Sequence, residues 1–141
     1  MKLPLGYRIN EISKLFREVV RKKANNLGIN STYTFILQIL ERNPNGITQV
    51  EIANKVCLKA PTISLTLNHM EQEELICREK SDEDSRKMLV KLTKKGLALN
   101  NQLCNVYHEA EELLMNSLTS DETDNLINYL EKMKNAMREG E

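Results

Sequence analysis

Residues 48–96 read TQVEIANKVCLKAPTISLTLNHMEQEELICREKSDEDSRKMLVKLTKKG, and this stretch decides the fold. Thr48 and Glu51 stand in capping-box spacing, so a helix is predicted to begin at Thr48. The apolar period then breaks at residues 57–59, just before Pro61, whose fixed φ suits the first turn of a second helix. A break of this length between two short helices indicates a helix-turn-helix.

The second of these helices has two different faces. Ile63, Leu67 and Met70 recur at helical spacing and predict an inward apolar stripe. The outward face is short-chained and hydrogen-bonding, which suits a helix in the major groove of DNA, and it carries Thr62, Ser64, Leu65 and Asn68. Asn68 could bind N6 and N7 of an adenine together, and Leu65 could contact a thymine methyl group, although a surface leucine without any function is also common.

After Leu75 the apolar period changes to two, which indicates β-strands. Met88, Val90 and Leu92 form one face of a strand, residues 76–80 would be its hairpin partner, and the charged residues 81–86 would be the tip. Two helices followed by such a hairpin predict a winged helix-turn-helix. The expected fold is mainly α with a small β-hairpin wing (α+β), and the expected activity is the reading of duplex DNA.

The hairpin region resembles the MarR family of bacterial and archaeal transcription regulators. The resemblance rests on three motifs at the family's spacing, which are Leu75-Ile76-Cys77-Arg78, Asp84-Ser85-Arg86 and Leu89-Val90-Lys91-Leu92-Thr93-Lys94-Lys95-Gly96. It implies that Arg86 enters the minor groove from the wing tip while Asp84 holds its guanidinium, and a narrow minor groove does attract arginine. The family often has a second arginine where this chain has Ser85, and acidic residues 82 and 83 crowd the tip, so we expect weaker wing binding than is usual in the family.

Three lysines are candidates for contacts with DNA phosphates. Lys59 precedes the second helix, Lys55 lies on the first, and Lys87 stands beside the wing. Each could equally be an ordinary solvated lysine. Together with the base-reading and wing residues, they complete a predicted DNA-binding set of Lys55, Lys59, Thr62, Ser64, Leu65, Asn68, Asp84, Arg86 and Lys87.

Charge is unevenly distributed along the 141 residues, although the formal net charge is zero. Residues 1–30 carry seven basic and two acidic residues, whereas residues 97–141 carry three basic and nine acidic ones. Phosphate affinity depends on the cations in contact and not on net charge, so neutrality does not exclude DNA binding. It predicts few phosphate contacts per subunit and an acidic C-terminal part that faces away from DNA.

Further helices flank the central stretch. A stripe from Ile9 to Val20 predicts a helix that ends at Leu27-Gly28, and residues 31–41 predict another. A long helical pattern runs from about Lys94 to Leu118, and residues 119 and 122 open a last helix in capping-box spacing. The winged core closes without the terminal helices, so their apolar faces are expected to pack against a second copy of the chain.

The family resemblance likewise implies a twofold dimer in which the first and last helices interlock. Such a homodimer presents two recognition helices one DNA turn apart, ~34 Å, and reads a pseudo-palindrome. We therefore expect a single MarR-type domain over residues 1–141, with the DNA-binding core at 31–96 and dimerisation helices at 1–30 and 97–141.

Regulation by a small molecule, often an aromatic anion, is also implied by the resemblance. A cleft between the dimer helices and the winged core would draw on Tyr7, Phe16, Arg17, Tyr33 and Tyr107, although packing is the more usual role of such residues. A thiol switch would fall on Cys57, which could equally be an inert small hydrophobe. Cys104, His108 and Glu112 recur at four-residue steps and could offer ligands to zinc, an arrangement that also arises by chance.

Other classes of protein have less support. Two histidines, no Gly-rich phosphate loop and no HExxH motif give no active site, so we expect no enzyme and no cofactor. The longest apolar stretch, residues 35–40, is too short to span a bilayer, and three cysteines without CxxC spacing fit a reducing compartment, so we expect a cytoplasmic protein.

The leading function is a dimeric DNA-binding regulator, and members of that family are more often repressors than activators. The alternative is a winged helix that binds protein instead of DNA.

Overall fold

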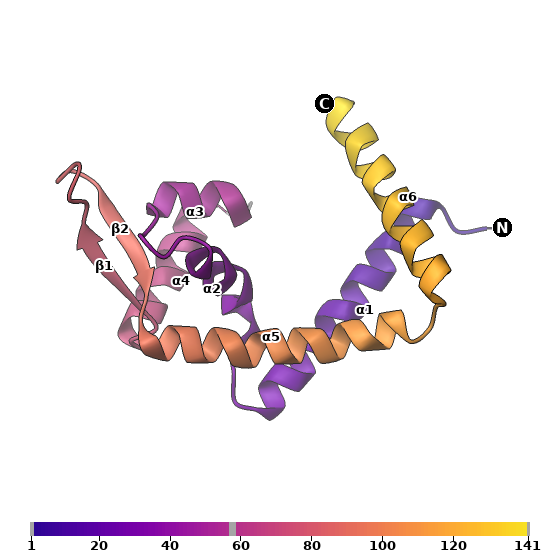
Figure 1. Ribbon diagram of the computed structural model, residues 1–141, viewed down its shortest axis with the longest axis horizontal. Coiled ribbons are helices and arrows are strands. Elements are labelled where there is room, and N and C mark those ends of the chain that lie inside the picture. Colours follow the sequence, from indigo (N-terminus) through magenta and orange to yellow (C-terminus); the bar gives the residue numbers. More distant parts are fainter. Residues whose placement is uncertain (1, 57–58, 141) are drawn as a thin grey trace. The chain divides into compact units, whose positions relative to one another are not determined.

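The computed structural model describes residues 2–56 and 59–140. Their elements follow in the order α1 (Leu5–Asn26), a 3-10 turn η1 (Ser31–Tyr33), α2 (Thr34–Glu41), α3 (Gln49–Val56), α4 (Ala60–Gln72), β1 (Ile76–Lys80), β2 (Met88–Leu92), α5 (Lys94–Met115) and α6 (Ser120–Glu139) (Figure 1). The chain divides into two compact units, one that ends at Val106 and one that begins at Tyr107. The fold is thus mainly helical with one two-stranded hairpin, as the sequence predicts.

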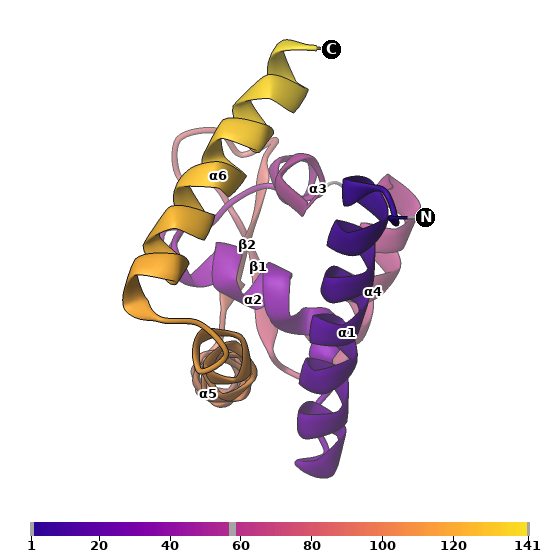
Figure 2. The ribbon, with the colours of Figure 1, turned by 90° about the vertical axis from the view of Figure 1, so that its right-hand side faces the viewer.

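The first unit is built around an aliphatic core. Helices α2, α3 and α4 contact one another or the hairpin, and both views of the ribbon show them gathered beside it (Figures 1 and 2). The largest fully buried side chains are Ile36, Leu37, Leu40, Ile52, Ile63, Leu67, Met70, Val90, Asn100 and Leu103. Burial of each large aliphatic side chain contributes about 1.5–3 kcal/mol, so this core holds the helix-turn-helix against the wing.

Local signals set several helix ends where they were predicted. Thr48 and Glu51 form both hydrogen bonds of a capping box, with Glu51 N–H to Thr48 Oγ1 at 3.3 Å and Thr48 N–H to Glu51 Oε2 at 3.2 Å. Helix α1 ends in a Schellman motif, because Gly28 has φ +70° and Ile29 N–H donates to Ala24 O at 2.9 Å. Both ends confirm predictions from sequence.

The hairpin pairs antiparallel, with Ile76 opposite Leu92 and Lys80 opposite Met88. Ile47 adds a bridge that the sequence did not predict, since its N–H and C=O pair with Val90 at 3.2 and 2.8 Å. Of the strand face predicted to be inward, Val90 is buried, Leu92 is half-buried and Met88 is exposed. Met88 lies at the tip end of the strand, beyond the cover of the helices, so that part of the alternation prediction is wrong.

The end of the hairpin closes onto the start of α5 at residues 93–96. Thr93 Oγ1 donates to Glu74 O at 2.6 Å and accepts from Gly96 N–H at 3.0 Å, so one hydroxyl joins the end of α4 to the first turn of α5. A Cβ on Gly96 would lie 2.0 Å from Leu75 O, so only glycine fits there. Glu74 has φ +62° as α4 ends, which costs a non-glycine residue about 1 kcal/mol.

The second unit contains the end of α5 and all of α6. Thr119 and Glu122 form the predicted capping box, with hydrogen bonds of 3.2 and 2.9 Å. Helix α5 ends at Met115 and not at Leu118, because residues 116–118 turn and the Ser117 hydroxyl donates to Leu114 O. No residue of α6 is buried within the chain.

Candidate nucleic-acid interface

Helix α4 presents the two faces that its sequence predicts. Ile63, Leu67 and Met70 are completely buried, which fixes the rotation of the helix against the core. The opposite side is open to solvent: Thr62, Leu65 and Asn68 are exposed and Ser64 is half-buried. Leu65 is 59 % exposed, so its side chain has no place in the core of this chain. The exposed face thus combines hydrogen-bonding groups with one apolar contact.

Asn68 has a partner that the sequence did not reveal. Its side-chain oxygen accepts a hydrogen bond from Arg78 Nη2 at 3.1 Å, and Arg78 comes from β1. Arg78 Nε lies 3.8 Å from Glu71 Oε2, one helical turn further along α4. Arg78 is part of the motif at residues 75–78 that resembles the family, but the sequence assigns it no role. Its partner Asn68 lies ten residues away in the chain and on another element, so no local pattern predicts the contact.

The wing tip places Arg86 in solvent and holds it there. The Arg86 side chain is 89 % exposed, and its Nε and Nη2 donate to the two carboxylate oxygens of Asp84 at 3.1 and 3.4 Å. Arg86 N–H also donates to Asp84 Oδ1 at 3.0 Å. These hydrogen bonds, the side-chain one first, lower the pKa of Asp84 below its usual range, so the clamp stays ionised.

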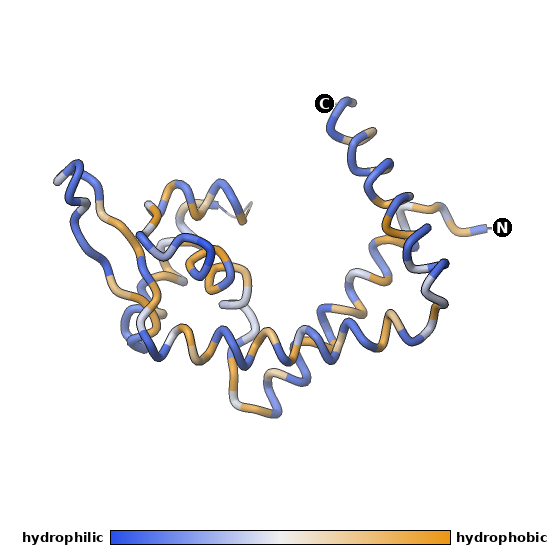
Figure 3. The backbone as a smooth tube through the Cα atoms, in the orientation of Figure 1, coloured by the Kyte–Doolittle hydropathy of each residue, from blue (hydrophilic) through white to orange (hydrophobic). Residues whose placement is uncertain are grey.

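The tip itself is a defined turn. Ser81 Oγ accepts from the backbone N–H groups of residues 83 and 84, and Lys87 N–H donates to Asp84 O at 2.9 Å. Hydrophilic residues gather at this end of the hairpin in Figure 3. These hydrogen bonds fix the backbone of the turn, so the position from which the Arg86 side chain extends is also fixed.

The three candidate lysines lie on the surface of the same unit. Lys55 is at the end of α3, Lys59 is the N-cap of α4, and Lys87 precedes β2. All three are exposed, and within residues 2–56 and 59–140 none of them takes part in an ion pair. Their ammonium groups are therefore available to phosphates.

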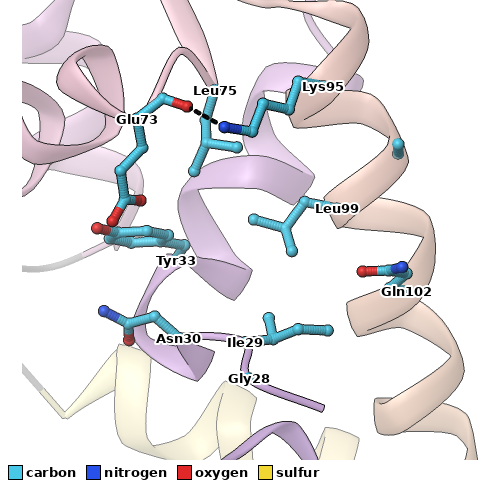
Figure 4. Close-up of a pocket in the computed structure, with 10 residues that line it drawn as sticks. Gly28, Ile29, Asn30, Tyr33, Glu73, Leu75, Lys95, Leu99 and Gln102 are labelled. Carbon is cyan, nitrogen blue, oxygen red and sulfur yellow. Dashed lines mark hydrogen bonds between the residues drawn. The ribbon is translucent and has the colours of Figure 1, made fainter.

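A cavity of about 490 Å³ lies in the first unit and contains one of the five aromatic or basic residues predicted to bind an effector. Tyr33, which is buried, lines it together with Ile29, Glu73, Lys95 and Leu99 (Figure 4). Lys95 Nζ donates to Glu73 O at 2.8 Å. Burial first, and then the Glu73 carboxylate, raises the pKa of Tyr33, so its hydroxyl stays protonated.

The other four predicted effector residues do not line this cavity. Tyr7 is exposed and lines a separate groove on α1, while Arg17 donates to Ser13 Oγ at 2.9 Å. Phe16 is half-buried, and Tyr107 belongs to the second unit. Positions 7 and 17 are about 15 Å apart along a helix, so one small cavity cannot take both.

Among the residues that the structure describes, the cysteines and the candidate zinc ligands form no cluster. Nowhere in the described residues do three His, Cys, Asp or Glu side chains group so that they could hold a metal ion. His108 Nε2 lies 3.3 Å from Glu112 Oε1, while Cys104 contacts Asn100. Partial burial and the Glu41 carboxylate raise the pKa of the Cys104 thiol, which disfavours the reactive thiolate. Cys57, the thiol-switch candidate, lies outside the described residues.

Among the described residues, no helix combines the length and the apolar character needed to cross a bilayer.

Comparison with known proteins agrees with this geometry. A family model described as the MarR family matches residues 29–88, which include α2, α3, α4 and β1. Among solved structures, S. aureus MepR in a DNA complex is 25% identical, with a TM-score of 0.84 over 96% of this chain and 99% of that one. The MepR F27L mutant bound to an oligodeoxyribonucleotide is 26% identical, with a TM-score of 0.62 over 96% of this chain and 99% of that one.

The E. coli protein MarR in its apo form shares the fold. It is 23% identical, with a TM-score of 0.81 over 94% of this chain and 98% of that one. The family match covers the helix-turn-helix and much of the wing, and the structural likeness extends over nearly the whole chain. The chain thus matches the MarR family over residues 29–88, and it has the winged helix-turn-helix fold of MepR and MarR.

Proposed function

We propose that this regulator is a repressor that binds a pseudo-palindromic operator as a homodimer, with α4 in the major groove and Arg86 in the minor groove. It is a DNA-binding protein and not an enzyme, and it acts in the cytoplasm. The observation that carries the proposal is the Asp84–Arg86 clamp, which holds the guanidinium of the 89 % exposed Arg86 side chain at the tip of the hairpin.

The clamp suits a minor-groove contact for a physical reason. A free arginine loses rotamer freedom when it enters a narrow groove, whereas Arg86 already has its guanidinium held by two oxygens of one carboxylate. The relatives MepR and its F27L mutant were solved with DNA, which supports the same partner here. On this proposal Thr62, Ser64, Leu65 and Asn68 face the bases, and Lys55, Lys59 and Lys87 face phosphates.

The dimer is proposed from exposed apolar faces. Leu126 and Leu130 of α6 are exposed, and so are Ile9 and Ile12 of α1. These residues recur at helical spacing, and none of them belongs to the buried core. Residues 1–30 and 97–141 are therefore proposed as dimerisation helices around the core at 31–96.

Release from DNA is proposed to follow binding of a small aromatic anion. The cavity lined by Tyr33 and Lys95 supports this, because it combines apolar walls with a cation and a neutral phenol. It lies between residues 73–75, which follow α4 directly, and the first turns of α5, so a ligand there contacts the segment that caps the recognition helix. A rise in melting temperature with phenolic acids would identify the class of ligand.

Titration of the chain against duplex DNA from its own upstream region, at two salt concentrations, tests the main proposal. We expect binding that weakens as salt rises, and we expect Arg86→Ala to lower affinity about tenfold or more and to reduce the salt slope by about one for each subunit. Lys132→Ala removes the same charge from α6 and should leave binding unchanged. Binding that ignores salt and Arg86→Ala alike would favour the alternative, a winged helix that binds protein.

A further inference from the structure

Arg78 lies on the side of the hairpin that faces α4. It stands opposite Val90 in the antiparallel register, and cross-strand partners share one face of a sheet. Val90 is buried, and β1 contacts α4, so the Arg78 side chain leaves the strand on the covered side. It is 25 % exposed there. A cation in this position needs a polar partner from the helix.

The partner that α4 supplies is the amide of Asn68. Arg78 Nη2 donates to Asn68 Oδ1 at 3.1 Å, whereas Arg78 Nε is buried without a hydrogen bond and lies 3.8 Å from Glu71 Oε2. Within the described residues, the hydrogen bond to Asn68 is the one that the guanidinium makes. Glu71 adds charge attraction from the next turn and keeps the guanidinium over this part of α4.

This contact decides which end of the amide is available. A guanidinium only donates hydrogen bonds, so the atom that faces it must be the amide oxygen. The nitrogen sits on the other side of the same planar carbon, and it has no partner among the described residues. Because Asn68 is exposed on the outward face of α4, it presents an NH₂ donor to whatever binds there.

We propose that Arg78 is a positioning residue that sets the base preference of Asn68. Building on the function proposed above, the held amide offers its NH₂ donor to guanine N7 and O6 together or to thymine O4, whereas adenine accepts only at N7 and sets its own N6 donor against the NH₂. The bidentate contact with adenine expected from the sequence needs the same oxygen to accept from adenine N6, and Arg78 draws that oxygen toward β1. Asn68 thus favours guanine or thymine over adenine at the base that it reads.

Selection from a pool of randomised duplexes tests this inference. Asn68→Ala should flatten the preference at one position of each half-site, which identifies the base that Asn68 reads. At that position the unchanged chain should prefer guanine or thymine to adenine by about tenfold. Arg78→Met keeps the apolar stem but frees the amide to rotate, so most of that discrimination should disappear there while the other positions keep theirs.

Lys91→Met is the matched control, because it removes a cation from the same hairpin. Lys91 Nζ lies 2.8 Å from Glu79 Oε2, and within the described part of the chain neither residue hydrogen-bonds to α4. The loss of this ion pair should leave every base preference in place. If Arg78→Met and Lys91→Met change the selected sequences in the same way, Arg78 acts only through general stability of the wing, and the inference fails.

Asn68→Asp provides a second variant that keeps the contact with Arg78. Its carboxylate has the shape of the amide but only accepts hydrogen bonds, so the preference should move toward cytosine, whose N4 donates. A preference for adenine in the unchanged chain, or no change with Asn68→Asp, would overturn the inference while DNA binding itself stands. Failure of the unchanged chain to bind any duplex would instead overturn the proposed function, and this inference with it.

Discussion

The two arginines of the hairpin, Arg78 and Arg86, are held by different kinds of partner. Arg86 is held by Asp84 two residues away, a contact that the local turn alone can form. Arg78 is held by Asn68 and Glu71 from another element, so its contact depends on how the hairpin packs on α4. The contact with Asp84 presents the Arg86 cation to solvent. The contact with Arg78 fixes the orientation of the uncharged Asn68 amide.

Asp84→Asn tests whether the clamp, and not net charge, serves binding. An asparagine keeps the size of the side chain but replaces one acceptor oxygen with an NH₂ donor, which cannot bind the guanidinium. The loss of one charge-assisted hydrogen bond should lower affinity for a specific duplex about 3- to 10-fold. The measurement is a fluorescence anisotropy titration at constant salt.

Asp82→Asn is the matched control for that experiment. It removes the same negative charge from the same tip, and Asp82 makes no hydrogen bond or ion pair with Arg86 in the described residues. Affinity should stay the same or rise, because a repulsive charge near phosphates is gone. Equal gains from both variants would show that the tip works only through its net charge.

At the scale of elements, the junction between α4 and α5 joins the recognition helix to the long helix. The Thr93 hydroxyl donates to Glu74 O and accepts from Gly96 N–H, and Lys95 Nζ donates to Glu73 O, so three hydrogen bonds tie the end of α4 to the first turn of α5. The motif that resembles the family at residues 92–96 therefore has a structural role. Lys95 of this motif also lines the cavity that contains Tyr33.

Gly96→Ala should destabilise the first unit strongly. The new Cβ would lie 2.0 Å from Leu75 O, which is backbone and cannot move aside without breaking the junction. We expect a loss of about 3 kcal/mol or more in the free energy of unfolding, measured with urea. Gly6→Ala is the control, because its Cβ would meet nothing within 4 Å, and it should be neutral or stabilising by up to about 1 kcal/mol. Similar effects from both would contradict the close approach at Gly96.

On the scale of the whole molecule, the terminal helices leave apolar surface unburied in one chain. Leu126 and Leu130 are 44 % and 45 % exposed, and no residue of α6 is buried. Contiguous apolar patches of this kind mark interaction sites in soluble proteins. The proposed homodimer would cover them and would place two copies of α4 on one side of a duplex.

Leu130→Asp should convert the expected dimer to a monomer, because it places a charge within the apolar stripe of α6. Sedimentation equilibrium measures the change in mass, and DNA affinity should fall with it since each monomer reaches a single half-site. Asn128→Asp adds the same charge about 200° around the helix and should leave the dimer intact. A monomeric unchanged chain would contradict the proposed assembly.

Signals between neighbours in the chain determined the fold. The capping boxes at Thr48 and Thr119, the αL glycine after α1 and the apolar stripe of α4 each act over a few residues, so the sequence alone predicted these features. The Asp84–Arg86 clamp was foreseen from the family resemblance, and its partners are two residues apart.

Contacts between distant segments were decided by the tertiary structure. The pairing of Ile47 with Val90, the contact of Arg78 with Asn68 and the placement of Tyr33 apart from Tyr7 and Arg17 depend on how α2, α4 and the hairpin pack together. Periodicity says which face of an element is buried, but not which residue of another element it meets. That choice comes from the joint packing of the core, which no local pattern encodes.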